Sequence, residues 1–210
     1  MATSRIVLAT GNRHKRDEIQ RVLGFLAGCL LSPQEIGPDV PDPPEKGDSY
    51  RENALIKARA FASWSGLPAL ADDSGLEVEA LHGRPGLHSS RYAGVGASFS
   101  DNVSQLLAEL RQVPEERRGA RFVCTLVVCR AEEILFECEA ESRGCIALEP
   151  RGAAGFGYDP VFIPEGGTRC FAELSAAEKD RISHRGRALE KFAAVVTAGA
   201  FPLFLPGETS

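Results

Sequence analysis

The spacing of apolar positions alternates along the chain between the two-residue period of strands and the 3.6-residue period of helices. Residues 5–9 form a short apolar run typical of a strand, and Asn12 is suited to cap the helix that follows. Ser49 and Glu52 fit a capping box at the start of a second helix, which Gly66 ends. The apolar side chains that predict the first helix are Ile19, Val22, Leu23 and Leu26.

The remainder of the chain predicts two more helices and an antiparallel pair of strands. An apolar run ends in Asp72-Asp-Ser-Gly75, which predicts a strand followed by a tight turn. Residues 120–130 and 134–148 read as two long strands, followed by a loop at 155–160 and a short strand at 161–163. Helices are expected after Ser100 and Ser183. Since βα units alternate with an antiparallel pair, we expect an α/β fold with a mixed sheet, and one domain over residues 1–210.

Composition places the chain among soluble globular proteins. Hydrophobic residues make up 43% and charged residues 25%, and the formal net charge is −5. An acidic chain of this kind is not expected to bind nucleic acid or an anionic membrane. No segment resembles a signal peptide or a membrane span, and the six cysteines form no C-x-x-C pair. We therefore expect a cytoplasmic protein with reduced thiols.

The adjacent acids Asp72 and Asp73 are the first candidate for chemistry. Neighbouring carboxylates repel each other, so a cation is expected to meet them. A divalent metal with phosphate oxygens is one such cation, and an acid beside it is suited to take a proton from water. An ordinary turn is the alternative, because Asp, Ser and Gly are all turn formers.

The segment Thr10-Gly-Asn-Arg-His-Lys15 joins the first strand to the first helix. A helix N-terminus presents N–H groups and positive potential, both of which favour phosphate. Gly11 lets a ligand approach the backbone, and Lys15 adds a full charge. The segment does not have the spacing of a P-loop. A capped helix with a surface lysine is the alternative interpretation.

A second loop, Gly155-Phe-Gly-Tyr-Asp-Pro160, places two aromatic residues between and beside glycines. Phe156 is suited either to stack on a nucleobase or to fill the core. Asp159 precedes a proline, so its backbone is expected to be extended and its carboxylate available as an acceptor or cap.

Three cationic or polar donors lie near the start of the last helix, namely Lys179, His184 and Arg185. In an acidic protein such a group favours a site for electron-rich oxygens, although a solvated basic patch is the alternative. Glu45 lies in a loop with five prolines between residues 32 and 48. Taken alone, it reads as a surface acid.

Six blocks in order make the pattern specific, and together they resemble the inosine/xanthosine triphosphate pyrophosphatase family from about residue 6 to about residue 192. The blocks are Thr10-Gly-Asn-x-x-Lys15, Glu52-Asn-Ala54 with Lys57-Ala58, Ala71-Asp-Asp-Ser-Gly75, Ser90-Arg-Tyr-Ala-Gly94, Gly155-Phe-Gly-Tyr-Asp-Pro160 and Ser183-His-Arg-Gly186. The resemblance implies an elongated mixed sheet, two lobes with a nucleotide cleft between them, and a homodimer. It also implies Mg²⁺-dependent hydrolysis of dITP, ITP and XTP to the monophosphate and pyrophosphate.

The resemblance also implies a role for each matching residue. Asp73 would be the general base and a metal ligand, Glu45 a second metal ligand, and Ser74 a substrate contact. Spacing leaves open which of Asp72 and Asp73 accepts the proton. The phosphate-binding loop falls on Thr10, Gly11, Asn12, Arg13, His14 and Lys15. The base-binding residues fall on Phe156, Gly157, Tyr158, Asp159, Lys179, His184 and Arg185.

Three other functions are weighed against this one. A related enzyme acting on pyrimidine or modified-base triphosphates would share the architecture, and a silent nucleotide sensor would bind without turnover. A nucleic-acid-binding protein is disfavoured by the charge of −5 and by the lack of a basic face studded with aromatic residues.

Overall fold

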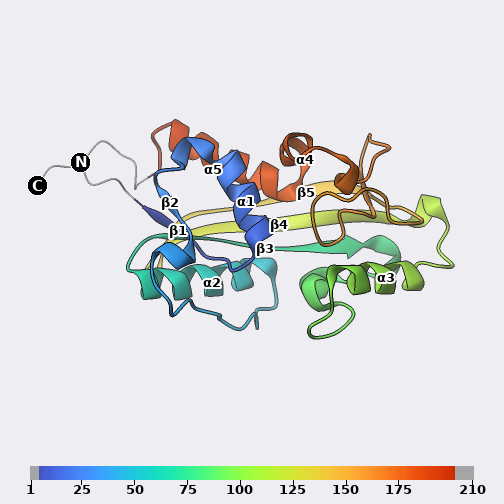
Figure 1. The fold of residues 1–210 in the computed structure, drawn as a ribbon, viewed down its shortest axis with the longest axis horizontal. Helices are drawn as coiled ribbons and strands as arrows, with labels where there is room; N and C mark the ends of the chain where they lie inside the picture. Colours follow the sequence, from blue (N-terminus) through green and yellow to red (C-terminus); the bar gives the residue numbers. More distant parts are fainter. Residues whose placement is uncertain (1–4, 202–210) are drawn as a thin grey trace, which may run out of the picture. The chain divides into compact units, whose positions relative to one another are not determined.

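Six strands form one sheet in the computed structural model, which describes residues 5–201 (Figure 1). The strand order is β2-β1-β3-β4-β5-β6. The strands are β1 (Ile6–Leu8), β2 (Leu30–Leu31), β3 (Ala69–Val78), β4 (Gly119–Arg130), β5 (Glu133–Ile146) and β6 (Phe162–Pro164). The α-helices are α1 (Arg13–Val22), α2 (Tyr50–Ser65), α3 (Phe99–Glu109), α4 (Ala176–Ile182) and α5 (His184–Thr197).

The sheet is mixed, which confirms the predicted α/β class. Strand β1 runs parallel to β2 and β3, whereas β5 and β6 are antiparallel. The predicted caps are also confirmed. The Asn12 side chain accepts from the backbone at the start of α1, and the Ser49 hydroxyl accepts from the Glu52 N–H at the start of α2. Gly66 ends α2 in the left-handed conformation, with φ of 66°.

The predicted acidic turn at residues 72–75 is wrong, because β3 continues through it from Ala69 to Val78. Strand β3 lies between β1 and β4 in the sheet. Pairing with neighbouring strands outweighs the turn preference of Asp, Ser and Gly, which is weak and local. The two acids are therefore held on a rigid strand.

Two smaller boundaries also differ from the prediction. The last strand is shifted by one residue, to Phe162–Pro164, and the strand predicted at residues 134–148 ends earlier, at Ile146. No helix between residues 5 and 201 is both long and apolar enough to cross a membrane.

The described chain divides into two compact units. The first comprises residues 5–73, 125–139 and 188–201, and the second comprises residues 74–124 and 140–187. The single domain and the nucleotide cleft expected from the sequence stay predictions.

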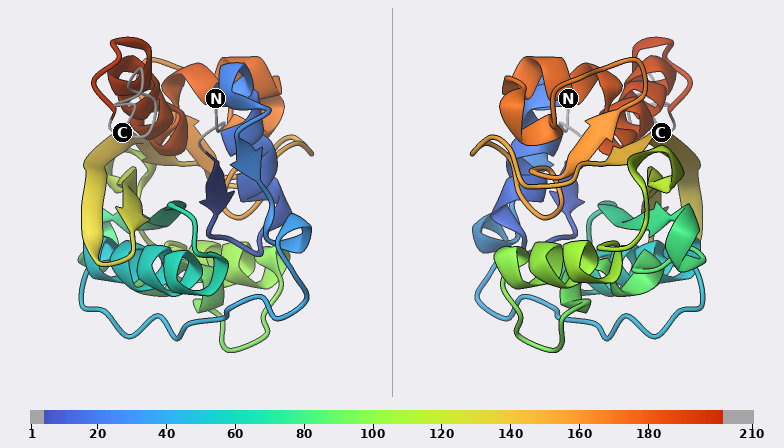
Figure 2. Two further views of the ribbon diagram at one scale, coloured as in Figure 1. Left: turned by 90° about the vertical axis from the view of Figure 1, so that its left-hand side faces the viewer. Right: turned by 90° about the vertical axis from the view of Figure 1, so that its right-hand side faces the viewer.

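In the first unit, α2 covers one side of the strands, while α1 and α5 lie on the other side (Figures 1 and 2). The buried face of α2 is mostly small and apolar, which brings the helix close to the sheet. The cluster that it forms with β1, β3 and β4 contains Val7, Ala9, Ala54, Leu55, Ala58, Phe61, Ala62, Ala69, Ala71, Val127 and Cys129.

In the second unit, α3 and α4 lie on opposite sides of the strands (Figure 1). Aromatic rings fill part of its core, where the Phe162 centroid lies 4.7 Å from that of Phe122 and 4.9 Å from that of Phe171. The apolar face of α3 contributes Val103, Leu106 and Leu110.

Hydrogen bonds from the Arg118 side chain connect the segment after α3 with the residue that follows β5. Its side chain is buried and donates to the backbone carbonyls of Leu110 at 2.7 Å, Val113 at 3.0 Å and Ala147 at 3.1 Å. A buried guanidinium with several carbonyl acceptors keeps its charge satisfied without a carboxylate.

We expect Arg118→Met to lower the free energy of unfolding by about 3 kcal/mol, because charge-assisted hydrogen bonds are lost and buried carbonyls lose a donor. Urea unfolding followed by circular dichroism measures the change. The exposed neighbour Arg117 gives the control, since Arg117→Met is expected to change stability by less than about 0.5 kcal/mol. Equal effects of the two substitutions would contradict this role of Arg118.

Candidate active site

Asp72 and Asp73 are both buried in β3, with 1% and 6% of their surface exposed. Because consecutive strand residues point to opposite faces of a sheet, the two carboxylates meet cations from different helices. Lys15 of α1 lies 3.0 Å from Asp72 Oδ2, and Lys57 of α2 lies 2.6 Å from Asp73 Oδ1. Each buried acid therefore has its own ammonium group.

Two polar side chains lie on the otherwise apolar face of α2, and both donate hydrogen bonds to Asp73. Asn53 and Lys57 are four residues apart and so lie on one side of the helix. Asn53 Nδ2 donates to Asp73 Oδ2 at 3.4 Å, and Asn53 Oδ1 accepts from the Gly47 N–H at 2.8 Å. Lys57 Nζ also donates to Glu45 Oε1 at 3.1 Å. Helix α2 thereby fixes the proline-rich loop, and Glu45 within it, beside the strand.

Burial and charge oppose each other in this cluster. Burial acts to lower the pKa of Lys57, but the attraction of Asp73, Asp72 and Glu45 outweighs it and raises the pKa above its ordinary value. The pKa of Asp73 is also raised, because burial and the nearby Glu45 outweigh the pull of Lys57 and Lys15. A carboxylate with a raised pKa is a better proton acceptor near neutral pH than an ordinary aspartate.

The oxygens around Lys57 also fit a magnesium ion. Asp73 Oδ1 and Glu45 Oε1 already converge on one cation, the Lys57 ammonium. Both are hard carboxylate oxygens, the ligand type that Mg²⁺ prefers. Between residues 5 and 201, no three His, Cys, Asp or Glu side chains gather as a metal site. Mg²⁺ commonly takes only one or two carboxylates and completes its shell with water and phosphate oxygens.

The predicted phosphate loop sits at the start of α1, where its backbone is well ordered by local hydrogen bonds. Asn12 Oδ1 accepts from the N–H groups of His14 at 2.9 Å and Lys15 at 3.4 Å. The Thr10 hydroxyl accepts from the Asn12 N–H at 3.1 Å. The Asn12 cap therefore engages two of the N–H groups that were expected to face phosphate.

The same loop leaves room for a ligand at its glycine. A Cβ placed on Gly11 would meet nothing within 4 Å, so packing does not require a glycine there. The side chains of Arg13 and His14 are exposed, and Arg13 lies 3.9 Å from Asp17. Among the predicted loop residues, the Lys15 side chain joins the acid cluster by donating to Asp72 Oδ2 at 3.0 Å.

A second cluster, in the second unit, surrounds the Phe156 loop. Gly155 and Gly157 have φ values of 74° and 62°, which other residues adopt only with strain. Asp159 closes this loop, since its Oδ2 accepts from the Phe156 N–H at 2.9 Å and from Lys179 Nζ at 2.5 Å. The predicted acceptor role of Asp159 is confirmed.

Two cations face the Phe156 ring. Lys179 Nζ lies 4.9 Å and Arg185 Cζ lies 5.8 Å from the ring centroid. Arg185 is 2% exposed, and its guanidinium donates to the Ser74 hydroxyl at 2.9 Å. The structure thus brings together five predicted site residues of this unit: Ser74, Phe156, Asp159, Lys179 and Arg185.

Gly186 allows Arg185 to reach this position. A Cβ at Gly186 would lie 1.7 Å from the carbonyl oxygen of Asp180, so only glycine permits the close approach of α5 to α4. Ser183 caps α5 as predicted, with its hydroxyl accepting from the Gly186 N–H at 3.1 Å.

Two further predicted residues, His184 and Tyr158, lie largely in the core. The His184 ring stacks on Phe122 with centroids 4.6 Å apart and an angle of 9° between the planes. Tyr158 is 4% exposed and donates its hydroxyl to the Ser89 carbonyl at 2.9 Å. These contacts fix the two side chains from inside the second unit.

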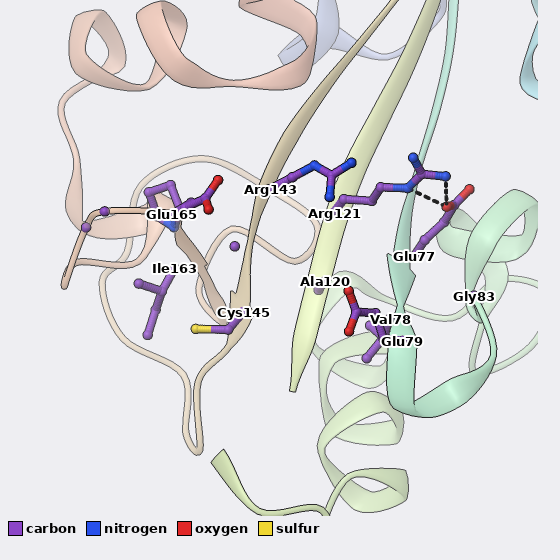
Figure 3. A pocket seen from close by; sticks show the side chains of 14 residues that line it. Glu77, Val78, Glu79, Gly83, Ala120, Arg121, Arg143, Cys145, Ile163 and Glu165 are labelled. Carbon is purple, nitrogen blue, oxygen red and sulfur yellow. Dashed lines mark hydrogen bonds and ion pairs between the residues drawn. The ribbon is translucent and has the colours of Figure 1, made fainter. Parts of the chain in front are cut away.

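The second unit also has a groove of about 660 Å³ (Figure 3). Among the described residues, its lining includes none of the predicted site residues. Arg121 lies beside it and pairs with Glu77 and Glu141, each at 2.8 Å, so its charge is already neutralised.

Asn53 and Lys57 were not predicted as site residues, although both lie in a block that carries the family resemblance. The sequence did contain a pattern that could have identified them, because these two polar residues are four positions apart on a helix face that also carries Ala54, Ala58 and Phe61. A polar pair on an apolar helix face requires buried partners.

Comparisons with known proteins agree with these motifs. A dITP/XTP pyrophosphatase from Mycobacterium tuberculosis is 49% identical over 191 residues, covering 89% of this chain and 92% of that protein. A dITP/XTP pyrophosphatase from Yersinia pseudotuberculosis is 47% identical over 190 residues, covering 89% and 94%.

Solved structures show the same fold. The HAM1 protein from Coxiella burnetii superposes with a TM-score of 0.84 at 42% identity, covering 93% of this chain and 99% of that one. A nucleoside-triphosphatase, or dITP/XTP pyrophosphatase, from Mycobacterium abscessus gives a TM-score of 0.70 at 44% identity, covering 90% and 97%. The Ham1 family matches residues 6–195. The chain therefore belongs to the Ham1 family.

Proposed function

We propose that this protein is a Mg²⁺-dependent hydrolase of non-canonical purine nucleoside triphosphates, which it converts to the monophosphate and pyrophosphate. The observation that carries the proposal is the buried group of Asp73, Lys57 and Glu45, in which two carboxylates converge on one cation. A purely structural ion pair has no need for the second acid. The names of the relatives described above point to the same reaction.

Asp73 is the proposed base. Its carboxylate, buried and held by Lys57 and Asn53, would accept a proton from the water that attacks the α-phosphorus. As the new P–O bond forms, the bond from the α-phosphorus to the bridging oxygen breaks and pyrophosphate leaves. Asn53 orients the carboxylate by donating to its second oxygen.

Glu45 and Asp73 are the proposed ligands of Mg²⁺. When bound, this ion neutralises phosphate charge and lowers the pKa of water. Lys15, on the first turn of α1, would hold the leaving phosphates by its charge. The open space beside Gly11 supports this placement.

The cluster around Phe156 is the proposed base site. Phe156 supplies a flat apolar surface for a purine, and Arg185 supplies donors for the 6-keto oxygen of hypoxanthine or xanthine. Adenine carries an amino group at that position, which would leave those buried donors unpaired. On the family resemblance alone, we further propose that the protein acts as a homodimer in the cytoplasm.

Pyrophosphate release across a nucleotide panel tests the proposal. We expect rapid release from ITP, dITP and XTP with Mg²⁺, slow release from ATP, and loss of activity after chelation. Preferred hydrolysis of CTP or UTP would instead identify a pyrimidine or modified-base enzyme. Binding of ITP without turnover in Mg²⁺ would identify a nucleotide sensor and overturn the proposed reaction.

We expect Asp73→Asn to lower kcat for ITP by at least about 10²-fold while leaving ITP affinity largely intact, because the amide cannot accept the proton. Single-turnover kinetics and calorimetric titration measure the two quantities. Asp72→Asn is the matched control, since Asp72 faces Lys15 and not Glu45. A larger loss of kcat in Asp72→Asn than in Asp73→Asn would reverse the assignment of the base.

We expect Arg185→Lys to reduce the ratio of kcat/KM for ITP over ATP by about tenfold, because lysine keeps the charge but loses the planar set of donors. Arg187→Lys is the control, since Arg187 is exposed and donates to the Glu141 carbonyl. An unchanged ratio in Arg185→Lys would place base selectivity on other residues.

A further inference from the structure

Phe99 is a large apolar residue that remains 43% exposed at the first position of α3. Single exposed apolar residues are common and need no explanation by themselves. Phe99 differs because its ring contacts Phe156, with centroids 5.9 Å apart and planes inclined at 50°. This separation and tilt fall in the range of favourable aromatic pairs.

The backbone that carries Phe99 is firmly fixed. The Ser98 hydroxyl accepts from the Asp101 N–H at 3.2 Å, and the Asp101 carboxylate accepts from the Ser98 N–H at 2.8 Å, forming a capping box. Asn102 is 2% exposed, accepts from the Ala93 N–H at 2.8 Å and donates to the Ser90 carbonyl at 3.2 Å. The ring of Phe99 is thus presented from an anchored helix start.

Phe156, by contrast, lies in a loop shaped by two glycines with positive φ. Asp159 closes this loop by accepting from the Phe156 N–H, which fixes the backbone there but does not by itself orient the ring. The Phe156 ring is contacted by the cations Lys179 and Arg185 and by the ring of Phe99. Phe99 is the apolar member of this set.

We infer that Phe99 is a positioning residue for the purine site, which holds the Phe156 ring in the orientation that a base requires for stacking. The inference rests on the proposed function and adds a residue from α3 to its base site. Phe99 acts on binding of the base through Phe156 and does not act on the phosphates or the attacking water.

The effect of Phe99→Ala should therefore appear in KM. Loss of an aromatic pair is expected to raise KM for ITP by about three- to tenfold at nearly constant kcat. Inhibition by pyrophosphate, which has no base, should be unchanged. Phe99→Tyr keeps the ring and should restore KM. Leu148→Ala removes another exposed apolar side chain of the same unit and serves as the control.

A double-mutant cycle with Phe156→Ala separates positioning from direct contact. If Phe99 acts through Phe156, Phe99→Ala should change KM little in the Phe156→Ala background. An unchanged KM in Phe99→Ala, an equal change in both backgrounds, or failure of Phe99→Tyr to restore KM would each overturn the inference. If the wild-type protein fails to hydrolyse ITP with Mg²⁺, the proposed function fails, and this inference fails with it.

Discussion

The ion pairs of two consecutive buried aspartates are the constraint on which the first unit depends. A strand inside a sheet gives Asp72 and Asp73 little access to bulk water, so each carboxylate requires a cation of its own. Strand alternation directs the two acids to opposite faces, and helices on opposite sides supply Lys15 and Lys57. The positions of α1 and α2 therefore depend on these two ion pairs with β3 as well as on apolar packing.

The two aspartates differ in the side chains that hold them, and this difference bears on which of them is the proposed base. Asp72 Oδ2 accepts from Lys15, whereas Asp73 accepts from both Lys57 and Asn53, and Lys57 extends the group to Glu45. The spacing in the sequence left the choice of base open. The geometry favours Asp73, because its carboxylate is held at both oxygens and shares a cation with a second acid.

Local features of the fold were predictable because their causes are local. The caps at Asn12, Ser49 and Ser183 each depend on a few neighbouring residues, and these predictions are confirmed. The continuation of β3 through Asp72 and Asp73 was not predictable in this way, because its cause is pairing with strands distant in sequence. The same limit applies to Lys57, whose partners lie 12 and 16 residues away. Nothing in the sequence indicated that the His184 ring would stack on Phe122.

Glycines in the second unit serve two different needs, the close approach of two helices and a positive φ, and both bear on the proposed base site. Gly186 is required by close packing, since a Cβ there would collide with the Asp180 carbonyl, and the result is a fixed Arg185. Gly155 and Gly157 are required by positive φ, which shapes the Phe156 loop, and Asp159 closes that loop by accepting from the Phe156 N–H. A flat aromatic surface is useful for recognition only when its orientation is held. Side chains on anchored helices contact the Phe156 ring and help to hold its orientation, among them Lys179, Arg185 and Phe99.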